Sequence, residues 1–135
     1  MAYWLLKTEP STYSYADLER DKKARWDGVS NPVALKNIRL MKKGDHAFIY
    51  HTGDEKAIVG IAQIISDSYP DPGAQDERLV VVDLKPERKL ARPVELGEVK
   101  ARKDFADFAL VRIGRLSVMP VSNAQWKTLL EMAAQ

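Results

Sequence analysis

The chain has 135 residues, of which 45% are hydrophobic and 30% charged, with no cysteine and two histidines. This is ordinary composition for a soluble globular protein. A chain of this length buries about two thirds of its unfolded surface on folding, so it forms a core without disulfides, metals or oligomerisation. Disulfides, thiolate nucleophiles and cysteine-based zinc sites are excluded, and we expect no metal, no cofactor and a monomer. No apolar run approaches the roughly 18 residues of a membrane span, and no secretory signal pattern is present. We therefore expect a cytoplasmic protein, accessible to the nucleoid if bacterial.

Charge is distributed unevenly although the net charge is only +2. Residues 1–50 carry +3, 51–84 carry −5, 85–103 carry +4 and 104–135 are neutral, so two basic stretches bracket an acidic one. Seven of the eleven aromatic residues also fall in the first 50. Basic residues interleaved with aromatics are typical of nucleic-acid-binding surfaces. The same pattern also arises when the lysines are merely solvated and the aromatic rings lie in the core.

Apolar and β-branched runs predict strands at 3–7, 46–50, 57–65 and 79–84. Capping signals and Pro93 predict helices at 15–21, 32–42, 94–100 and 122–132. Residues 110–121 are expected to be extended, with breaks at Gly114 and Pro120. Gly60 indicates a bulge or a close backbone approach inside its strand. Strands joined by hairpins rather than regular βαβ units predict an α+β fold with a curved or closed, mostly antiparallel sheet.

The helix starts are the strongest local signals. Ser14-Tyr-Ala-Asp17 and Ser122-Asn-Ala-Gln125 are capping boxes, and Asn31-Pro32 places a cap residue before a proline at the first helical position. The only linker-like piece is 69–77, which is too short to divide the chain, so we expect a single domain over residues 1–135. The helix at 32–42 carries a basic stripe of Lys36, Arg39 and Lys43. Such a stripe is typical either of a solvated face or of a phosphate contact, and these three residues are the candidate phosphate contacts.

Catalytic motifs are absent. The sequence has no Gly-x-Ser-x-Gly elbow, no Gly-x-x-x-x-Gly-Lys loop and no Gly-x-Gly-x-x-Gly fingerprint. His51 beside Glu9 or Asp54 is the one acid/base pair that an enzyme acting on a small molecule or base would have. We therefore expect a protein that is not an enzyme, and keep the His51/Glu9 enzyme as an alternative.

Polar and aromatic residues gather where the expected strands and helices end, which is where a scaffold presents binding groups. Trp26 is the most informative, because Arg25, Asp27 and Gly28 flank it and it lies in no apolar run. An open ring there could stack on a ligand, while a core tryptophan is the competing interpretation. The other junction residues are Lys7, Thr8, Glu9, Asn31, Tyr50, His51, Thr52, Arg115 and Ser117.

These same stretches resemble the EVE domain family, in order and over essentially the whole chain. The matching blocks are Trp4-Leu-Leu-Lys-Thr-Glu-Pro10, Trp26-Asp-Gly-Val29 with Asn31, Gly44-Asp45, Tyr50-His51, Val59-Gly60-Ile61-Ala62, Tyr69-Pro-Asp71 and Arg115-Leu-Ser-Val-Met-Pro-Val121. The resemblance implies a PUA-like fold, a small mixed β-barrel with flanking helices. It also implies a non-catalytic reader that holds a flipped, modified base, chiefly methylated or hydroxymethylated cytosine in DNA.

Carried over by position, the resemblance implies a role for each junction residue. Lys7, Thr8 and Glu9 would form one pocket wall, Trp26 the stacking ring, Asp27 and Asn31 polar contacts, Tyr50, His51 and Thr52 the opposite side, and Arg115 and Ser117 the rim. This chain has Ser30-Asn31-Pro32 where the family commonly has Arg-Asn-Tyr, and Gly114 where many members have serine. Binding of RNA, as by other PUA-like barrels, and a protein-interaction module remain as alternatives.

Overall fold

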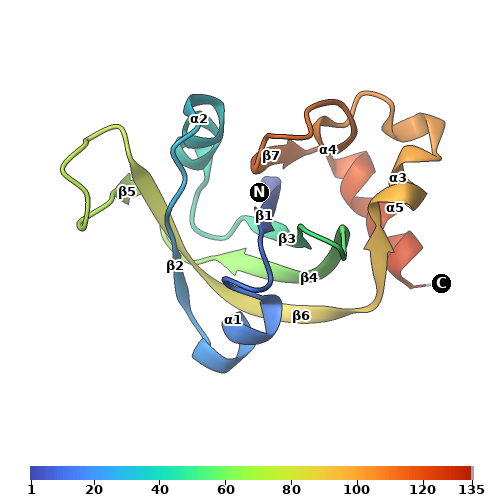
Figure 1. The fold of residues 1–135 in the computed structure, drawn as a ribbon, viewed down its shortest axis with the longest axis horizontal. Coiled ribbons are helices and arrows are strands. Elements are labelled where there is room, and N and C mark those ends of the chain that lie inside the picture. The colour runs from blue at the N-terminus through green and yellow to red at the C-terminus, as the bar shows by residue number, and fades with distance from the viewer. Residues whose placement is uncertain (135) are drawn as a thin grey trace.

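The computed structural model describes residues 1–134 as a curled sheet flanked by short helices (Figure 1). The strands are β1 (Tyr3–Thr8), β2 (Ala24–Trp26), β3 (His46–His51), β4 (Ala57–Ile64), β5 (Tyr69–Pro70), β6 (Val80–Glu95) and β7 (Val118–Val121). Their order is β2-β6-β4-β3-β1-β7, with β5 paired to β6. β1 and β3 are parallel and the other neighbouring pairs antiparallel, which confirms the expected mixed, mostly antiparallel fold.

Five short α-helices surround the sheet. They are α1 (Tyr15–Asp21), α2 (Pro32–Leu40), α3 (Leu96–Lys100), α4 (Ala109–Arg112) and α5 (Asn123–Ala133), with a 3₁₀ turn η1 at Lys103–Phe105. In Figure 1, α3, α4 and α5 gather at one end of the sheet, while α1 and α2 lie along the course of β2. No helix within residues 1–134 is long and apolar enough to cross a membrane.

The predicted helix caps are confirmed. The Ser14 hydroxyl accepts from the backbone N–H of Asp17, whose carboxylate accepts from the N–H of Ser14. Ser122 and Gln125 form the same reciprocal pair at the start of α5. Such caps satisfy backbone donors that have no partner inside the helix, which is why so few residues locate the helix starts.

Three segments differ from the expected elements. β6 continues to Glu95 instead of stopping at residue 84, because pairing with β4 along its length supplies backbone hydrogen bonds even where its charged side chains face solvent. The helix expected at 94–100 therefore begins at Leu96. The extended segment expected from residue 110 is wrong for Ala109–Arg112, where the N–H groups of the turn donate back to the carbonyl of Phe108.

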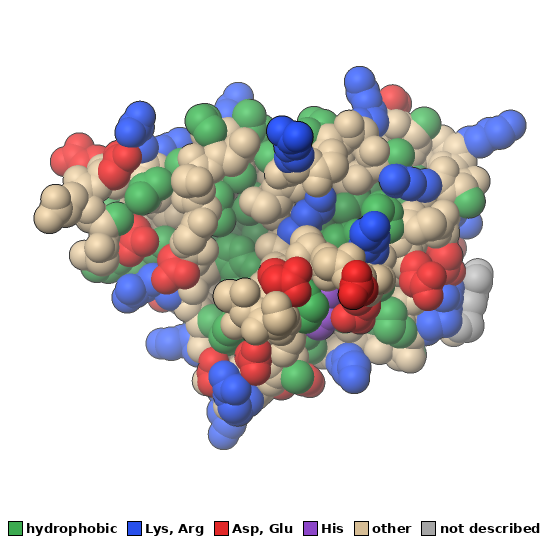
Figure 2. Space-filling view, in the orientation of Figure 1, with side chains coloured by type: hydrophobic (Ala, Val, Ile, Leu, Met, Phe, Trp, Pro, Cys, Tyr) green, Lys and Arg blue, Asp and Glu red, His purple; other side chains and the backbone are tan. Residues whose placement is uncertain are grey.

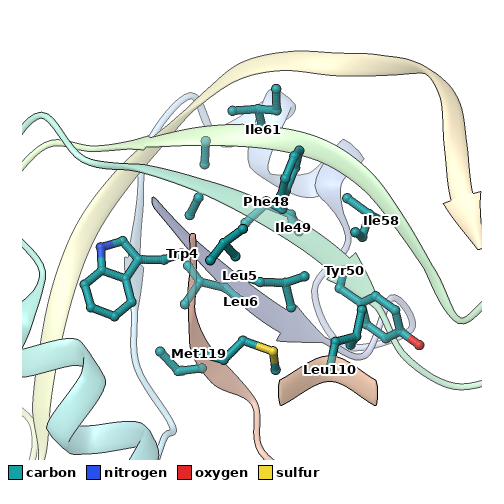
Figure 3. Close-up of a cluster of buried hydrophobic side chains, with 14 of the residues drawn as sticks. Trp4, Leu5, Leu6, Phe48, Ile49, Tyr50, Ile58, Ile61, Leu110 and Met119 are labelled. Carbon is teal, nitrogen blue, oxygen red and sulfur yellow. The ribbon is translucent and has the colours of Figure 1, made fainter. Parts of the chain in front are cut away.

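The core lies between the curled sheet and the helices. Leu5 and Leu6 of β1 and Phe48 of β3 are fully buried at its centre (Figure 3). Trp126 of α5 stacks on Phe48 with ring centroids 3.9 Å apart and closes one side of the core. Each fully buried aliphatic or aromatic side chain contributes about 1.5–3 kcal/mol, so this cluster holds β1 in a fixed position.

Gly60 in β4 brings α1 onto the sheet. A Cβ at this position would lie less than 3.0 Å from atoms of the Tyr15 ring. The Tyr15 hydroxyl donates to the Ile61 carbonyl at 2.7 Å, and its backbone N–H donates to His51 Nε2 at 3.0 Å. The pairing register of β4 also shifts beside Gly60, which confirms the first of the two expected alternatives, a bulge; the group that approaches the glycine closely is a side-chain ring and not another backbone.

Asp45 is a buried carboxylate that ties the chain start to β3. Its two oxygens accept from the Ala2 N–H, the Trp4 indole N–H and the Lys42 N–H, each at 3.0 Å. Burial by itself would raise the pKa of Asp45, but the hydrogen bonds from Trp4, Ala2 and Lys42 outweigh it and hold the pKa below its ordinary value. The bond to Lys42 also explains why α2 stops at Leu40 and not at Lys42 as expected.

Asp45→Asn is expected to lower the free energy of unfolding at pH 7 by about 2–3 kcal/mol, because an amide cannot accept from all three donors. A carboxylate with a depressed folded pKa stabilises the fold above its unfolded pKa of about 3.9, and this stabilisation is lost as pH falls through the folded value. The difference between wild type and variant should therefore shrink by pH 3. Urea unfolding at both pH values measures it, with exposed Asp107→Asn as the control; equal stabilities at pH 7 would refute this role for Asp45.

Candidate functional site

A cavity of about 680 Å³ opens between the end of β1 and the segment that joins β2 to α2. Its volume lies within the roughly 300–1,000 Å³ of small-molecule sites. Figure 2 shows a central hollow with a hydrophobic floor and charged side chains along its edges. We call this the main cavity, and its lining residues are Lys7, Thr8, Glu9, Thr12, Tyr13, Ala24, Arg25, Trp26, Asp27, Gly28, Val29, Ser30, Asn31 and Ser117.

Two aromatic rings form one wall of the main cavity. Trp26 ends β2, where its backbone pairs with Val82 of β6, and its side chain is only 8% exposed. The Tyr13 ring meets it edge to face, with centroids 6.4 Å apart. The Tyr13 hydroxyl donates to Asp21, and burial together with this carboxylate raises the pKa of Tyr13 to about 12. The ring pair is therefore held in place. Trp26 is largely buried, as in the competing core interpretation, and not the open ring expected from the sequence, so a flat ligand would stack on its small exposed part and on the half-buried Tyr13 ring.

The end of β1 supplies a cation and an anion. The Lys7 ammonium is half-buried, which lowers its pKa, and it donates to the Gly114 carbonyl at 3.0 Å. The Glu9 carboxylate accepts from the backbone N–H and the hydroxyl of Ser11 and from the Thr52 hydroxyl, and these bonds lower the pKa of Glu9. Lys7 therefore offers a donor to a ligand, and Glu9 an ionised acceptor at neutral pH.

The opposite side of the main cavity is the turn that enters α2. Gly28 adopts a φ of +77°, a left-handed conformation that favours glycine, and so allows the chain to turn directly after Trp26. Asn31 caps α2 through its side-chain oxygen, which accepts from the N–H groups of Val33 and Ala34. Within residues 1–134 its amide NH₂ group has no hydrogen-bond partner, so it is available as a donor.

The structure brings seven of the eleven junction residues to the main cavity. They are Lys7, Thr8, Glu9, Trp26, Asp27, Asn31 and Ser117. Tyr50 and Thr52 instead line a smaller hollow of about 200 Å³, called the side hollow below, which also includes Lys7. Arg115 is exposed and lines neither.

His51 does not line the main cavity. It is buried, its Nε2 accepts the N–H of Tyr15 at 3.0 Å, and its Nδ1 lies 2.8 Å from a carboxylate oxygen of Glu55. Both ring nitrogens are therefore engaged: the Nε2 bond ties α1 to β3, and the Nδ1 contact ties the end of β3 to the turn that follows it. Because a general base needs a free nitrogen within reach of its substrate, this geometry gives no support to the His51/Glu9 enzyme.

The phosphate contacts expected from the sequence lie away from both hollows. Lys36, Arg39 and Lys43 are exposed on α2 and the turn after it, and none lines the main cavity or the side hollow. The Arg39 guanidinium donates to the Arg78 carbonyl at 2.7 Å. Within residues 1–134 no group of three His, Asp or Glu side chains is placed to hold a metal ion.

Sequence reasoning missed Tyr13 and Arg25 as cavity residues. Tyr13 lies at a junction, directly before the Ser14 cap of α1. Arg25 belongs to the three-residue strand β2, which was not predicted, and its guanidinium reaches Tyr69. Like Trp26, Tyr13 is an aromatic residue at the end of an element, and this signal in the sequence identifies it as a candidate cavity residue.

The family model of the EVE domain matches residues 2–132. The chain belongs to the EVE domain family. Mouse thymocyte nuclear protein 1 is 29% identical to this EVE domain over 96% of this chain and 73% of its own length. The resemblance seen in the sequence blocks is thereby confirmed.

Solved structures resemble this EVE domain over nearly its full length. Rpa0253 of Rhodopseudomonas palustris has a TM-score of 0.94 and 42% identity, covering 99% of this chain and 94% of that one. Human THYN1, solved in complex with DNA containing 5-methylcytosine, has a TM-score of 0.91 and 25% identity, covering 100% and 99%. ASCH of Zymomonas mobilis, with a TM-score of 0.65 and 12% identity over 97% and 95%, shows the fold alone and supports the PUA-like architecture.

Proposed function

We propose that this EVE domain is a non-catalytic module that binds nucleic acid, chiefly DNA, and holds a flipped, modified cytosine in the main cavity. The observation that carries the proposal is the ring pair of Trp26 and Tyr13 in a cavity of base-accommodating size. The complex of human THYN1 with 5-methylcytosine DNA supports the same partner class. We propose that the domain binds as a monomer.

The residue types match what holding a base requires. Stacking on an aromatic ring contributes about 1–3 kcal/mol, which is comparable with the few kcal/mol needed to unstack a nucleotide. The remaining affinity has to come from polar and phosphate contacts. The cavity offers donors from Lys7 and Asn31 and an acceptor from Glu9, which suits a base edge that carries both donors and acceptors.

Selectivity should depend on the polarity of the modification. One buried methyl group contributes only about 0.8 kcal/mol, so a methylated cytosine gains roughly fourfold at most. A hydroxyl group on the modification can accept from the Asn31 amide or donate to the Thr8 hydroxyl oxygen, and a site built around such a bond discriminates more strongly. We expect hydroxymethylcytosine to be preferred over methylcytosine by about tenfold.

Fluorescence anisotropy with duplexes that differ at one cytosine measures this preference, with the same strand as RNA in a parallel arm. Asn31→Asp retains the cap oxygen but has no donor, so it should lose the hydroxymethyl preference without a change in unfolding temperature. Identical titration curves for modified and unmodified duplexes at low salt would contradict the proposed function. Tighter binding of RNA would favour the RNA-binding alternative.

A further inference from the structure

The side hollow lies next to the main cavity and has a different chemistry. Lys7 lines both. The charged residues of the main cavity are two basic and two acidic, whereas those of the side hollow are three lysines and no acidic residue. The side hollow is lined by Lys7, Tyr50, Thr52, Gly53, Lys56, Leu96, Lys100, Leu110, Val111 and Gly114.

Two of its lysines are free to bind a ligand. Lys56 precedes β4 with a φ of +46°, and its carbonyl accepts the N–H of Leu96 at 2.8 Å. This bond fixes the turn against the start of α3, whose last residue is Lys100. Both lysines are exposed, and within residues 1–134 neither has a hydrogen bond or salt bridge from its side chain. In Figure 2, basic side chains gather above and to the right of the central hollow, with acidic ones below it.

The floor of the side hollow is apolar. Leu96, Leu110, Val111 and the Tyr50 ring supply it, and the Lys7 ammonium lies 5.6 Å from the centre of that ring. An apolar floor under a cationic rim matches a sugar–phosphate unit, because the carbon face of the sugar packs on the aliphatic groups while the ammonium groups meet the phosphate. A free inorganic phosphate would use the lysines but leave the apolar floor uncovered.

We propose that the sugar–phosphate backbone adjacent to the bound base lies in the side hollow, with its phosphate held by Lys56 and Lys100. The inference rests on the proposed function: because Lys7 lines both hollows, the backbone of a base held in the main cavity would run past Lys7 toward this one. It assigns phosphate binding to the end of the molecule that carries β4 and α3. Lys36 and Arg39 on α2 and Lys43 in the turn after it then lie outside the binding surface.

Paired charge-neutralising variants test the assignment. Lys56→Gln/Lys100→Gln should weaken binding at about 0.1 M salt by at least fivefold for modified and unmodified oligonucleotides alike, and should reduce the slope of log K against log[salt] by about 1 to 2. The preference for the modified base should stay unchanged. Lys36→Gln/Lys43→Gln removes the same charge and should behave as wild type. Thermal unfolding confirms that both variants are folded.

A second arm replaces single phosphates by neutral methylphosphonates. The substitution beside the modified nucleotide should weaken binding to wild type and have little further effect on Lys56→Gln/Lys100→Gln. If the salt slope of Lys56→Gln/Lys100→Gln is unchanged, or if the control pair loses as much affinity, the inference is overturned while modification-dependent binding stands. Failure of wild type to bind any oligonucleotide overturns the proposed function and this inference together.

Discussion

Trp26→Ala is expected to lower the affinity for a modified oligonucleotide by about 5- to 150-fold, because a base stacked on an aromatic ring contributes about 1–3 kcal/mol. The ratio of affinities for modified and unmodified duplexes should fall to nearly one, since the flipped base loses its surface in the main cavity. Trp26 is only 8% exposed, so the same substitution is also expected to cost about 3–5 kcal/mol of stability. Binding is therefore measured well below the unfolding temperature of the variant.

Trp126 provides a matched control for this loss of packing. It has the same exposed fraction of 8%, but it stacks on Phe48 and Tyr3 in the core and lines neither hollow. Trp126→Phe and Trp26→Phe retain a ring and cost less stability than the alanine variants. Reduced base discrimination in Trp26→Phe, but not in Trp126→Phe, is the expected pattern. Equal discrimination in the two would mean that Trp26 is a core residue only.

Gly60→Ala is expected to destabilise the protein by about 3 kcal/mol or more, the upper part of the usual range for overpacking. The new methyl group would meet the ring of Tyr15 at less than 3.0 Å, and that ring is held by its hydrogen bond to Ile61 and by its own backbone bond to His51. Neither the ring nor α1 can retreat without breaking one of these bonds. Thermal unfolding should show a decrease of about 10 °C or more.

The cause of that loss can be isolated by a second variant. In a Tyr15→Ala background the ring is absent, so Gly60→Ala should cost much less than it does in wild type, a coupling that a double-mutant cycle measures. Gly97→Ala is the control, because an added Cβ there meets nothing within 4 Å. It should be neutral or slightly stabilising. Additive costs for Tyr15→Ala and Gly60→Ala would show that the contact with Tyr15 is not the reason.

Elements defined by short-range signals could be predicted from the sequence. The capping box at Ser14, the cap at Asn31 and the second box at Ser122 located three helices, because each depends on residues within one turn. The irregular pairing at Gly60 followed from a glycine in a β-branched run. These signals need no knowledge of what packs against them.

Elements defined by pairing partners could not be predicted in the same way. The second half of β6 is charged and becomes a strand because β4 pairs with it, as Ala62 with Pro86 and Ile58 with Val94. The short β2 depends on the first part of β6 in the same manner. The parallel pairing of β1 with β3 requires the long crossover through α1 and α2, which no local pattern reveals.

The residues of the candidate site differ in the same way: some are placed by short-range signals and others by the curl of the sheet. Trp26, Asp27 and Asn31 lie close together in the sequence and share one turn, so their meeting at the main cavity was within reach of sequence reasoning. His51 and Tyr50 also lie at a strand end, yet His51 is turned toward α1 by its bond to Tyr15, and Tyr50 faces the side hollow. Which face each strand residue occupies depends on the curl of the whole sheet.

The most direct test of the central claim follows the modified base itself. A duplex carrying one cytosine with a ¹³C-labelled 5-methyl group is titrated with the protein and observed by NMR. If the base enters the main cavity, the methyl resonance should shift through the ring currents of Trp26 and Tyr13 and show nuclear Overhauser contacts to both rings. A methyl resonance that stays at its free-duplex position while the duplex is bound would contradict the account.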